Sequence, residues 1–168
     1  MTKPKPLPSQ ERLQELFSFS VVTGELRWQK SYNNTYTGRV AGKVLTNGYR
    51  YVTLEGKHLL AHRVVWKWVT GQDPLNHQID HIDGDRTNNA WHNLRLATSA
   101  NNCHNRGRQS NNKSGFKGVS LHVQGRWVAR IRANGIDKHL GLYDTPEEAH
   151  AAYVAAAERF HGDFARAH

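Results

Sequence analysis

A polar, basic stretch interrupts the chain at residues 105–115, which read NRGRQSNNKSG. The stretch has no apolar periodicity, and its composition is typical of a solvated linker that can also contact phosphates. We therefore expect the residues on its two sides to fold separately, each around its own small core. A chain of 168 residues with 38% hydrophobic residues can bury such cores.

The part before this stretch predicts a helix, a set of short strands and a second helix. Residues 9–19 place leucines and a phenylalanine on one helical face, after a serine that can cap the helix. Glycines then separate short apolar stretches between residues 21 and 60, which indicates antiparallel strands with a hairpin turn at 54–57. Residues 61–71 have apolar residues at helical spacing and end at a glycine, so they predict a helix.

The segment IDHIDGDRTNNAWHNLRLATSANN at residues 79–102 concentrates aspartates, histidines and asparagines. Each of these residue types is common in turns, and only their combination indicates a site. HQIDH and LRLAT predict two short strands joined by a loop, and Thr98 can cap a helix after them, which gives a ββα unit. Carboxylate and amide oxygens suit Mg²⁺ or Mn²⁺, and a neutral histidine can take a proton from water.

Residues 20–105 resemble the HNH endonucleases of the phage and intron homing type. The resemblance lies in this motif and in GKVLTNGYRYVTLEGKHLLAHRVVWKWVTG before it. It implies that Asp80 and Asn102 hold a divalent ion, that His81 is the general base, and that Asn93 braces the loop holding the base. Many members have Glu where this chain has Asn101, which would alter ion preference or water placement.

Other polar residues in and near the motif are expected to be structural. His62 could approach the site, but like His77 and His92 it is interpreted as a packing or hydrogen-bonding side chain. Asp83 and Asp85 belong to a DGD sequence that is typical of a turn, and the resemblance gives them no place at the ion.

Residues 116–168 predict three strands, with short turns at QG and NG, followed by an alanine-rich helix. Strand alternation places Arg126, Arg130 and Arg132, together with Val128, on one face and an apolar set on the other, which can pack on the helix. With Lys117 on a neighbouring strand, these arginines could bind guanine edges or phosphates in a DNA groove. The alternative is a solvated outer face with no partner.

The segment from 113 to 167 resembles the plant APETALA or ethylene-response type of DNA-binding domain. FKGV, RWVARI, HLGLYDTPEEAHAAYVAAA and HGDFA match that pattern. The resemblance implies DNA contacts by Lys117, Arg126 and Arg132. Arg130 replaces a usual Glu, so the preferred base sequence is expected to differ.

Charge and cysteine content narrow the function classes. A net charge of +9 and a pI near 9.9 favour a polyanionic partner, and Arg106 and Arg108 are candidate phosphate contacts. The lone Cys103 excludes an intrachain disulfide and a cysteine-rich zinc site. The chain has neither a membrane span nor an apolar leader at its start, so we expect a cytoplasmic protein, acting in a bacterial host if phage-encoded.

Together these features predict an α+β protein in which a ββα-metal nuclease fold precedes a small three-stranded antiparallel sheet packed on one helix. The predicted boundaries are an arm and short helix at 1–19, the nuclease at 20–105, a basic linker at 106–115 and a DNA-binding domain at 116–168. The predicted function is cleavage of double-stranded DNA at a preferred site, with one Mg²⁺ or Mn²⁺ per site, by a monomer or homodimer. The alternatives are a catalytically inactive HNH-fold transcription regulator and an RNA-binding protein.

Overall fold

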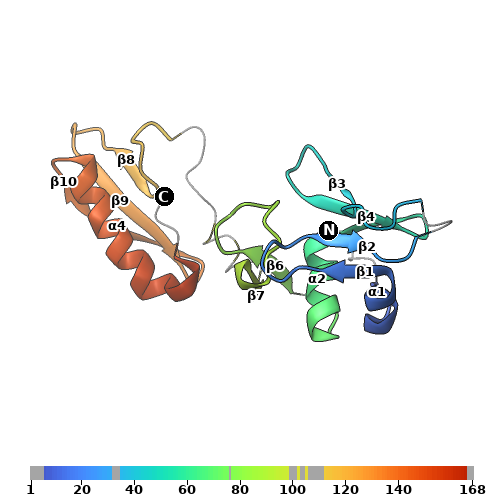
Figure 1. Cartoon of the computed structure of the whole chain (residues 1–168). Coiled ribbons are helices and arrows are strands. Elements are labelled where there is room, and N and C mark those ends of the chain that lie inside the picture. Colours follow the sequence, from blue (N-terminus) through green and yellow to red (C-terminus); the bar gives the residue numbers. More distant parts are fainter. Residues whose placement is uncertain are drawn as a thin grey trace. The chain divides into compact units, whose positions relative to one another are not determined.

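The computed structural model describes residues 6–31, 35–75, 77–98, 102, 105 and 112–165. These residues belong to two compact units, one within 1–99 and one within 100–168 (Figure 1). Most of the predicted linker, most of the predicted helix after Thr98 and the first five residues of the predicted arm lie outside the described residues. No helix in the described ranges is long and apolar enough to cross a membrane.

The first unit begins with helix α1 (Gln10–Leu16), which Ser9 caps by accepting a hydrogen bond from the backbone of Arg12. The predicted helix continued to residue 19, and this end was wrong. Phe17–Phe19 forms strand β1, which pairs antiparallel with β2 (Leu26–Trp28). The pairing satisfies the backbone of Phe17 in an extended conformation and places its ring 4.4 Å from that of Trp28, so tertiary contacts override helical spacing.

A three-stranded antiparallel sheet follows, formed by β3 (Lys43–Val44), β4 (Arg50–Leu54) and β5 (Lys57–Leu60) in that order. The turn at Glu55 and Gly56 has positive φ at both residues, and it confirms the predicted hairpin. Strand β5 runs directly into helix α2 (Ala61–Thr70), which ends at Gly71 in the left-handed conformation, as predicted. The first turns of α2 are buried.

A second hairpin carries most of the polar motif. Strand β6 (Gln78–His81) pairs antiparallel with β7 (Leu94–Ala97), and a loop with the short 3-10 helix η2 (Trp91–Asn93) joins them. The two predicted strands are therefore confirmed. The hairpin covers a core that α1, α2 and the neighbouring strands share, with these fully buried members: Leu13, Phe17, Leu26, Val52, Val64 and Val65.

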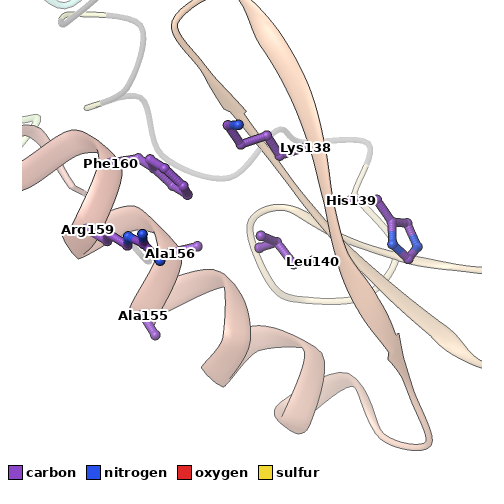
Figure 2. Close-up of a pocket in the computed structure, with 7 residues that line it drawn as sticks. All are labelled: Lys138, His139, Leu140, Ala155, Ala156, Arg159 and Phe160. Carbon is purple, nitrogen blue, oxygen red and sulfur yellow. The ribbon is translucent and has the colours of Figure 1, made fainter.

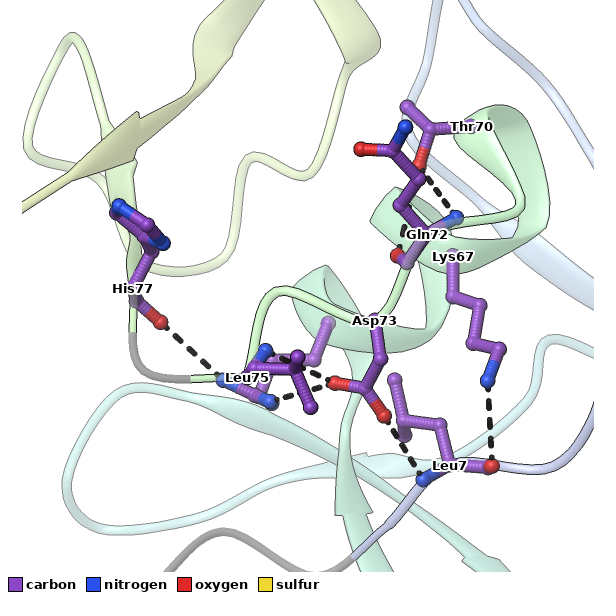
Figure 3. Close-up of polar contacts among 8 residues, drawn as sticks. Leu7, Lys67, Thr70, Gln72, Asp73, Leu75 and His77 are labelled. Carbon is purple, nitrogen blue, oxygen red and sulfur yellow. Dashed lines mark hydrogen bonds and ion pairs between the residues drawn. The ribbon is translucent and has the colours of Figure 1, made fainter.

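The carboxylate of Asp73 fixes the chain between α2 and β6 (Figure 3). It accepts hydrogen bonds from the backbone of Leu7 at 3.2 Å and of Leu75 at 3.1 Å, and it pairs with Arg63 at 3.0 Å. Lys67 donates to the carbonyl of Leu7 at 3.4 Å. Because Arg63 lies in the first turns of α2, this network ties that part of the helix to the segment that enters β6.

The second unit is a three-stranded antiparallel sheet packed on helix α4 (Pro146–His161), as predicted (Figure 1). Its strands are β8 (Val119–Leu121), β9 (Trp127–Ala133) and β10 (Ile136–Tyr143), with β9 in the centre. Thr145 and Glu148 form a reciprocal capping box at the start of α4, and η3 (Gly162–Phe164) follows the helix. The helix-facing core contains Val119, Ala129, Ile131, Ala149, Tyr153, Ala156 and Ala157.

Candidate functional site

His81 is the last residue of β6, and its side chain is buried. Its Nε2 lies 3.0 Å from the side-chain oxygen of Asn89, which is also buried. An amide oxygen only accepts hydrogen bonds, so Nε2 carries the hydrogen and Nδ1 is the basic nitrogen of the neutral ring. The sequence-based prediction did not include Asn89, because eight positions separate it from His81 along a loop whose path the spacing does not define.

The side chain of Asn93 fixes the conformation of the loop between His81 and Asn89 through three hydrogen bonds. Its oxygen accepts from the backbone of Asp83 at 3.0 Å, and its nitrogen donates to the Asp83 carboxylate at 2.9 Å and to the carbonyl of Asn88 at 2.8 Å. Asn88 donates to the same carboxylate at 2.7 Å. Burial opposes the charge of Asp83, but hydrogen bonds from Asn93, Asn88 and the Asp85 backbone hold its pKa below the ordinary value. The ionised carboxylate of Asp83 therefore stabilises the conformation of the loop by accepting these hydrogen bonds.

The turn between β1 and β2 supports the segment that carries Asn89. Gly24 in this turn has a φ of 73°, and a Cβ there would lie 2.2 Å from the backbone nitrogen of Ala90 and 2.3 Å from the carbonyl carbon of Asn89. The backbone of Trp91 donates to the carbonyl of Val21 at 3.1 Å. Only glycine fits this close approach.

Two aromatic rings border His81 within the same unit. The ring of His62, from the first turn of α2, is perpendicular to that of His81, and their centroids lie 5.2 Å apart. The ring centroid of Tyr49 lies 5.2 Å from that of His62 and 6.1 Å from that of His81. His62 is buried, and its Nδ1 has no hydrogen-bond partner among the described residues. Burial, with smaller effects of His81 and Arg63, lowers the pKa of His62 to about 3, so this ring is neutral at pH 7.

Asp80 is buried beside Arg95, its cross-strand partner in the β6–β7 register. Arg95 contacts the same oxygen, Oδ2, through Nε at 2.9 Å and through Nη2 at 2.8 Å. A carboxylate has about four acceptor positions, and its oxygens are the donors that hard divalent cations prefer, so Asp80 fits the predicted role of an ion ligand. The sequence-based prediction missed Arg95 because the register of the two strands was not known.

The remaining ion-ligand candidate belongs to the other unit. Asn102 is helical and half-buried, and it falls within 100–168. The first unit thus brings together Asp80, His81 and Asn93, and Asn102 lies in the second unit. In the described part of the chain, no group of three or more His, Cys, Asp or Glu side chains forms a metal cluster.

In the second unit, the three predicted arginines lie at or in β9 and are exposed. Arg126 pairs with Asp144 at 2.9 Å, and Arg132 pairs with Asp137 at 3.4 Å. The side chain of Arg130 makes no hydrogen bond or ion pair with any residue that the structure describes, whereas its backbone donates to the carbonyl of Gly118 at 2.8 Å. Since its neighbours in the strand, Ala129 and Ile131, face the helix, the arginines occupy the opposite face.

Lys117 does not lie in a strand, which corrects the sequence-based placement. It precedes β8, and its Nζ lies 6.0 Å from the ring centroid of Tyr153 on α4. The backbone at Gly118 packs closely on the ring of Tyr153. A Cβ at Gly118 would lie 2.1 Å from the Cδ2 atom of that ring, so a larger residue does not fit. Arg106 and Arg108 lie outside the described residues.

Parts of the chain are similar in sequence to known proteins. Residues 59–104 match the family model described as HNH endonuclease. Protein 3.8 of Escherichia phage T7 is 36% identical over 106 residues, which are 62% of this chain and 87% of that protein. An uncharacterised HNH endonuclease, L560, of Acanthamoeba polyphaga mimivirus is 34% identical over 105 residues, 62% of this chain and 54% of that protein.

A further similarity involves a different class of protein. The ethylene-responsive transcription factor ERF084 of Arabidopsis thaliana is 48% identical over 64 residues, 36% of this chain and 25% of that protein. On the family-model match and the extensive similarity to the phage protein, the chain belongs to the HNH endonuclease family.

Proposed function

We propose that this protein is a DNA endonuclease of the homing type that hydrolyses phosphodiester bonds with His81 as the general base. The observation that carries the proposal is the buried hydrogen bond between His81 and Asn89, which makes Nδ1 the proton-accepting nitrogen. Membership of the HNH endonuclease family supports the reaction class. The similarity to a phage T7 protein supports action inside the bacterial host of a phage.

In the proposed reaction, Nδ1 of His81 takes a proton from a water molecule as its oxygen bonds to phosphorus. The bond between phosphorus and the 3′ oxygen breaks, and that oxygen takes a proton from solvent, which leaves 5′-phosphate and 3′-hydroxyl ends. Asn89 keeps the hydrogen on Nε2 throughout, and its oxygen stabilises the imidazolium that forms. Asn93 holds the intervening loop in shape through its bonds to Asp83 and Asn88.

We propose Asp80 as a ligand of one divalent ion, Mg²⁺ or Mn²⁺, with Asn102 as the second protein ligand predicted from the sequence. Such an ion, when bound, is a Lewis acid that stabilises the charge of the phosphate and of the leaving oxygen. The contribution of the chain is a buried carboxylate whose orientation is fixed by Arg95 through Oδ2.

We further propose that the arginine face of the second unit binds duplex DNA and sets site preference. The side chain of Arg130 has no hydrogen-bond or ion-pair partner in the described ranges, and the pairs that Arg126 and Arg132 make with Asp144 and Asp137 are exposed. Exposed ion pairs contribute little stability, so phosphates or guanine edges can replace these aspartates. The similarity to a transcription factor supports a DNA-reading role for one part of the chain.

The test of catalysis is cleavage of supercoiled plasmid and phage DNA with Mg²⁺, with Mn²⁺ and with EDTA. We expect nicked or linear products only with the ion, and a loss of about 10²- to 10⁴-fold in rate for His81→Ala with little change in DNA affinity. His58→Ala, at an exposed position on β5, is the matched control. If DNA ligase rejoins the ends without further treatment, the products carry 5′-phosphate and 3′-hydroxyl groups.

Two outcomes would favour the rival functions, and a third experiment gives the preferred site. DNA binding with no cleavage under any ion would indicate an inactive HNH-fold regulator. Preferential binding of a labelled RNA over duplex DNA would indicate an RNA-binding protein. Cleavage of a random-sequence DNA pool, read by sequencing, would give the preferred site, and nicked circles against linear DNA would show whether one or both strands are cut.

The arginine face has its own test, which is equilibrium binding to duplex DNA at two salt concentrations in EDTA. Arg130→Ala and Arg132→Ala should each weaken binding. A lost phosphate contact should flatten the salt dependence, and a lost base contact should cost about 1–3 kcal/mol at its position. Asp137→Asn releases Arg132 and removes a negative charge, so it should strengthen binding. Unchanged affinity in all three variants would leave this face without a DNA role.

A further inference from the structure

A groove of about 610 Å³ lies between β10 and α4 in the second unit (Figure 2). Strand β10 is an edge strand, and its Lys138 is paired in register with Ile131, which faces the helix. Figure 2 shows Lys138 and Leu140 on the helix side of the strand and His139 pointing the other way. Since His139 is paired in register with Arg130, the groove and the arginine face lie on opposite sides of the sheet.

The groove combines two cations with an aromatic ring. The Nζ of Lys138 lies 5.4 Å from the ring centroid of Phe160, and the guanidinium carbon of Arg159 lies 5.5 Å from it. Phe160 is 38% exposed, so part of its ring is accessible to a ligand. Within the described ranges neither cation has an ion pair, and the residues that line the groove include no carboxylate.

The lining also includes His139, whose ring points away from the groove (Figure 2), and the remaining residues are apolar. Leu140 comes from β10, and Ala155 and Ala156 come from α4, one turn before Phe160. Small side chains on the helix leave the space that larger ones would fill. Pockets of a few hundred cubic ångströms hold small molecules, and a single nucleotide is within this size.

We propose that this groove binds one nucleotide of a single-stranded nucleic acid, with its phosphate near Lys138 and Arg159 and its base against Phe160 and the apolar floor. Proteins that bind single strands combine a basic groove with aromatic rings on which bases stack. A paired base in a duplex keeps its faces inside the stack, so it cannot enter a concave site of this kind. The second unit would then bind duplex DNA on one face and an unpaired strand on the other.

The experiment uses the full-length protein in EDTA, so that its outcome does not depend on cleavage. Fluorescence anisotropy measures binding of a labelled oligothymidine and of a labelled duplex. The double variant Lys138→Gln with Arg159→Gln should weaken binding of the oligothymidine about tenfold and that of the duplex by less than about twofold. The matched control, Arg130→Gln with Arg132→Gln on the opposite face, should show the reverse pattern.

The ring of Phe160 is tested separately. Phe160→Leu should weaken oligothymidine binding at least about fivefold, because base stacking on an aromatic ring is lost, whereas Phe160→Tyr should retain it. Thermal unfolding followed by circular dichroism identifies any variant that does not fold, and the Tyr variant together with the charge variants keeps the test decisive in that case. Thymidine monophosphate should displace the oligomer more effectively than inorganic phosphate.

Three results would overturn the proposal. The first is oligothymidine affinity unchanged in the Lys138 and Arg159 double variant. The second is self-association of that variant with unchanged affinity, which would mean that Lys138 only prevents edge-strand pairing between copies. The third is displacement by inorganic phosphate as effective as by the mononucleotide, which would exclude a base contact.

Discussion

Asn89 and His81 meet in a buried hydrogen bond of 3.0 Å although they lie at opposite ends of a loop. The bond makes the two ring nitrogens different, because Nε2 donates its hydrogen to Asn89 and Nδ1 is the basic nitrogen. The proposed base therefore depends on Asn89 for its tautomer and its orientation. Its own position depends on the loop brace at Asn93 and on the close approach at Gly24.

Removing the Asn89 side chain should slow cleavage while leaving DNA affinity close to that of the parent. We expect Asn89→Ala to lower the single-turnover rate about tenfold to a hundredfold, a part of what a general base contributes, because the ring loses its fixed orientation. Gln29→Ala, at an exposed position of the same unit, should cleave at the parental rate. A parental rate in Asn89→Ala would show that the hydrogen bond has no role in catalysis.

Gly24→Ala should destabilise the first unit and slow cleavage. Its Cβ would meet the backbone of Asn89 and Ala90 and displace them, in addition to the strain of a positive φ. Gly38→Ala is the matched control, because Gly38 has a φ of 80° and no atom within 4 Å of its added Cβ. We expect a cost of about 1–2 kcal/mol for the control and about 1–3 kcal/mol more for Gly24→Ala, measured by denaturant unfolding. Equal costs would mean that the turn does not support the site.

His62 should make stability depend on pH. Burial lowers its pKa from 6.5 to about 3, so between these values the unfolded chain binds a proton that the folded chain does not. Stability should therefore fall as the pH drops below 6.5, by up to about 1.4 kcal/mol per unit, and the loss should level off below about 3.

The measurement is unfolding followed by tryptophan fluorescence, since Trp28, Trp66, Trp68 and Trp91, four of the five tryptophans, lie in the first unit. His62→Gln should have a flatter pH dependence than the parent, whatever its absolute stability. The exposed control His58→Gln should retain the parental slope. The same slope in His62→Gln as in the parent would contradict the lowered pKa.

Arg95→Ala should be destabilised and then partly restored by Mg²⁺. The substitution leaves Asp80 as a buried carboxylate without its ion-pair partner, which typically costs about 3–5 kcal/mol. A divalent ion that binds Asp80 in the folded state supplies the missing positive charge and raises the unfolding temperature by mass action.

Arg63→Ala is the matched control for the ion. It breaks a similarly buried pair with Asp73, at a position that the proposed ion does not contact. We expect a comparable loss of stability with no recovery in Mg²⁺. An equal response of the two variants to Mg²⁺, or no response in either, would remove Asp80 as an ion ligand.

Local patterns predicted most of the secondary structure. The hairpin at 54–57, the helix that Gly71 ends, the two strands of the motif and the capped helix after Thr145 all follow from turn residues, caps and periodicity. Those signals are contained within a few neighbouring residues. The end of α1 was missed because the pairing of Phe17 with Trp28 arises from a distant strand.

The contacts of the site were harder to predict for a similar reason. Asp80 and His81 are recognisable from their motif, whereas their partners Arg95 and Asn89 depend on strand register and loop path. His62 was interpreted as packing, and its burial beside the ring of His81 is visible only when α2 and β6 are placed together. In the sequence, Gly24 is only one of the glycines that separate short apolar stretches.

The separate cores of the two units affect how such a protein can diversify. The buried cluster of the first unit contains no residue after Leu94, and those of the second begin at Val119. An exchange of genetic material after Asn102 and before Asn112 would join a different carboxyl-terminal unit to an amino-terminal part that keeps Asp80, Arg95 and Asn102, without creating a cavity in either cluster. A lineage could in this way acquire a different DNA preference in a single event while keeping the residues of the proposed nuclease site.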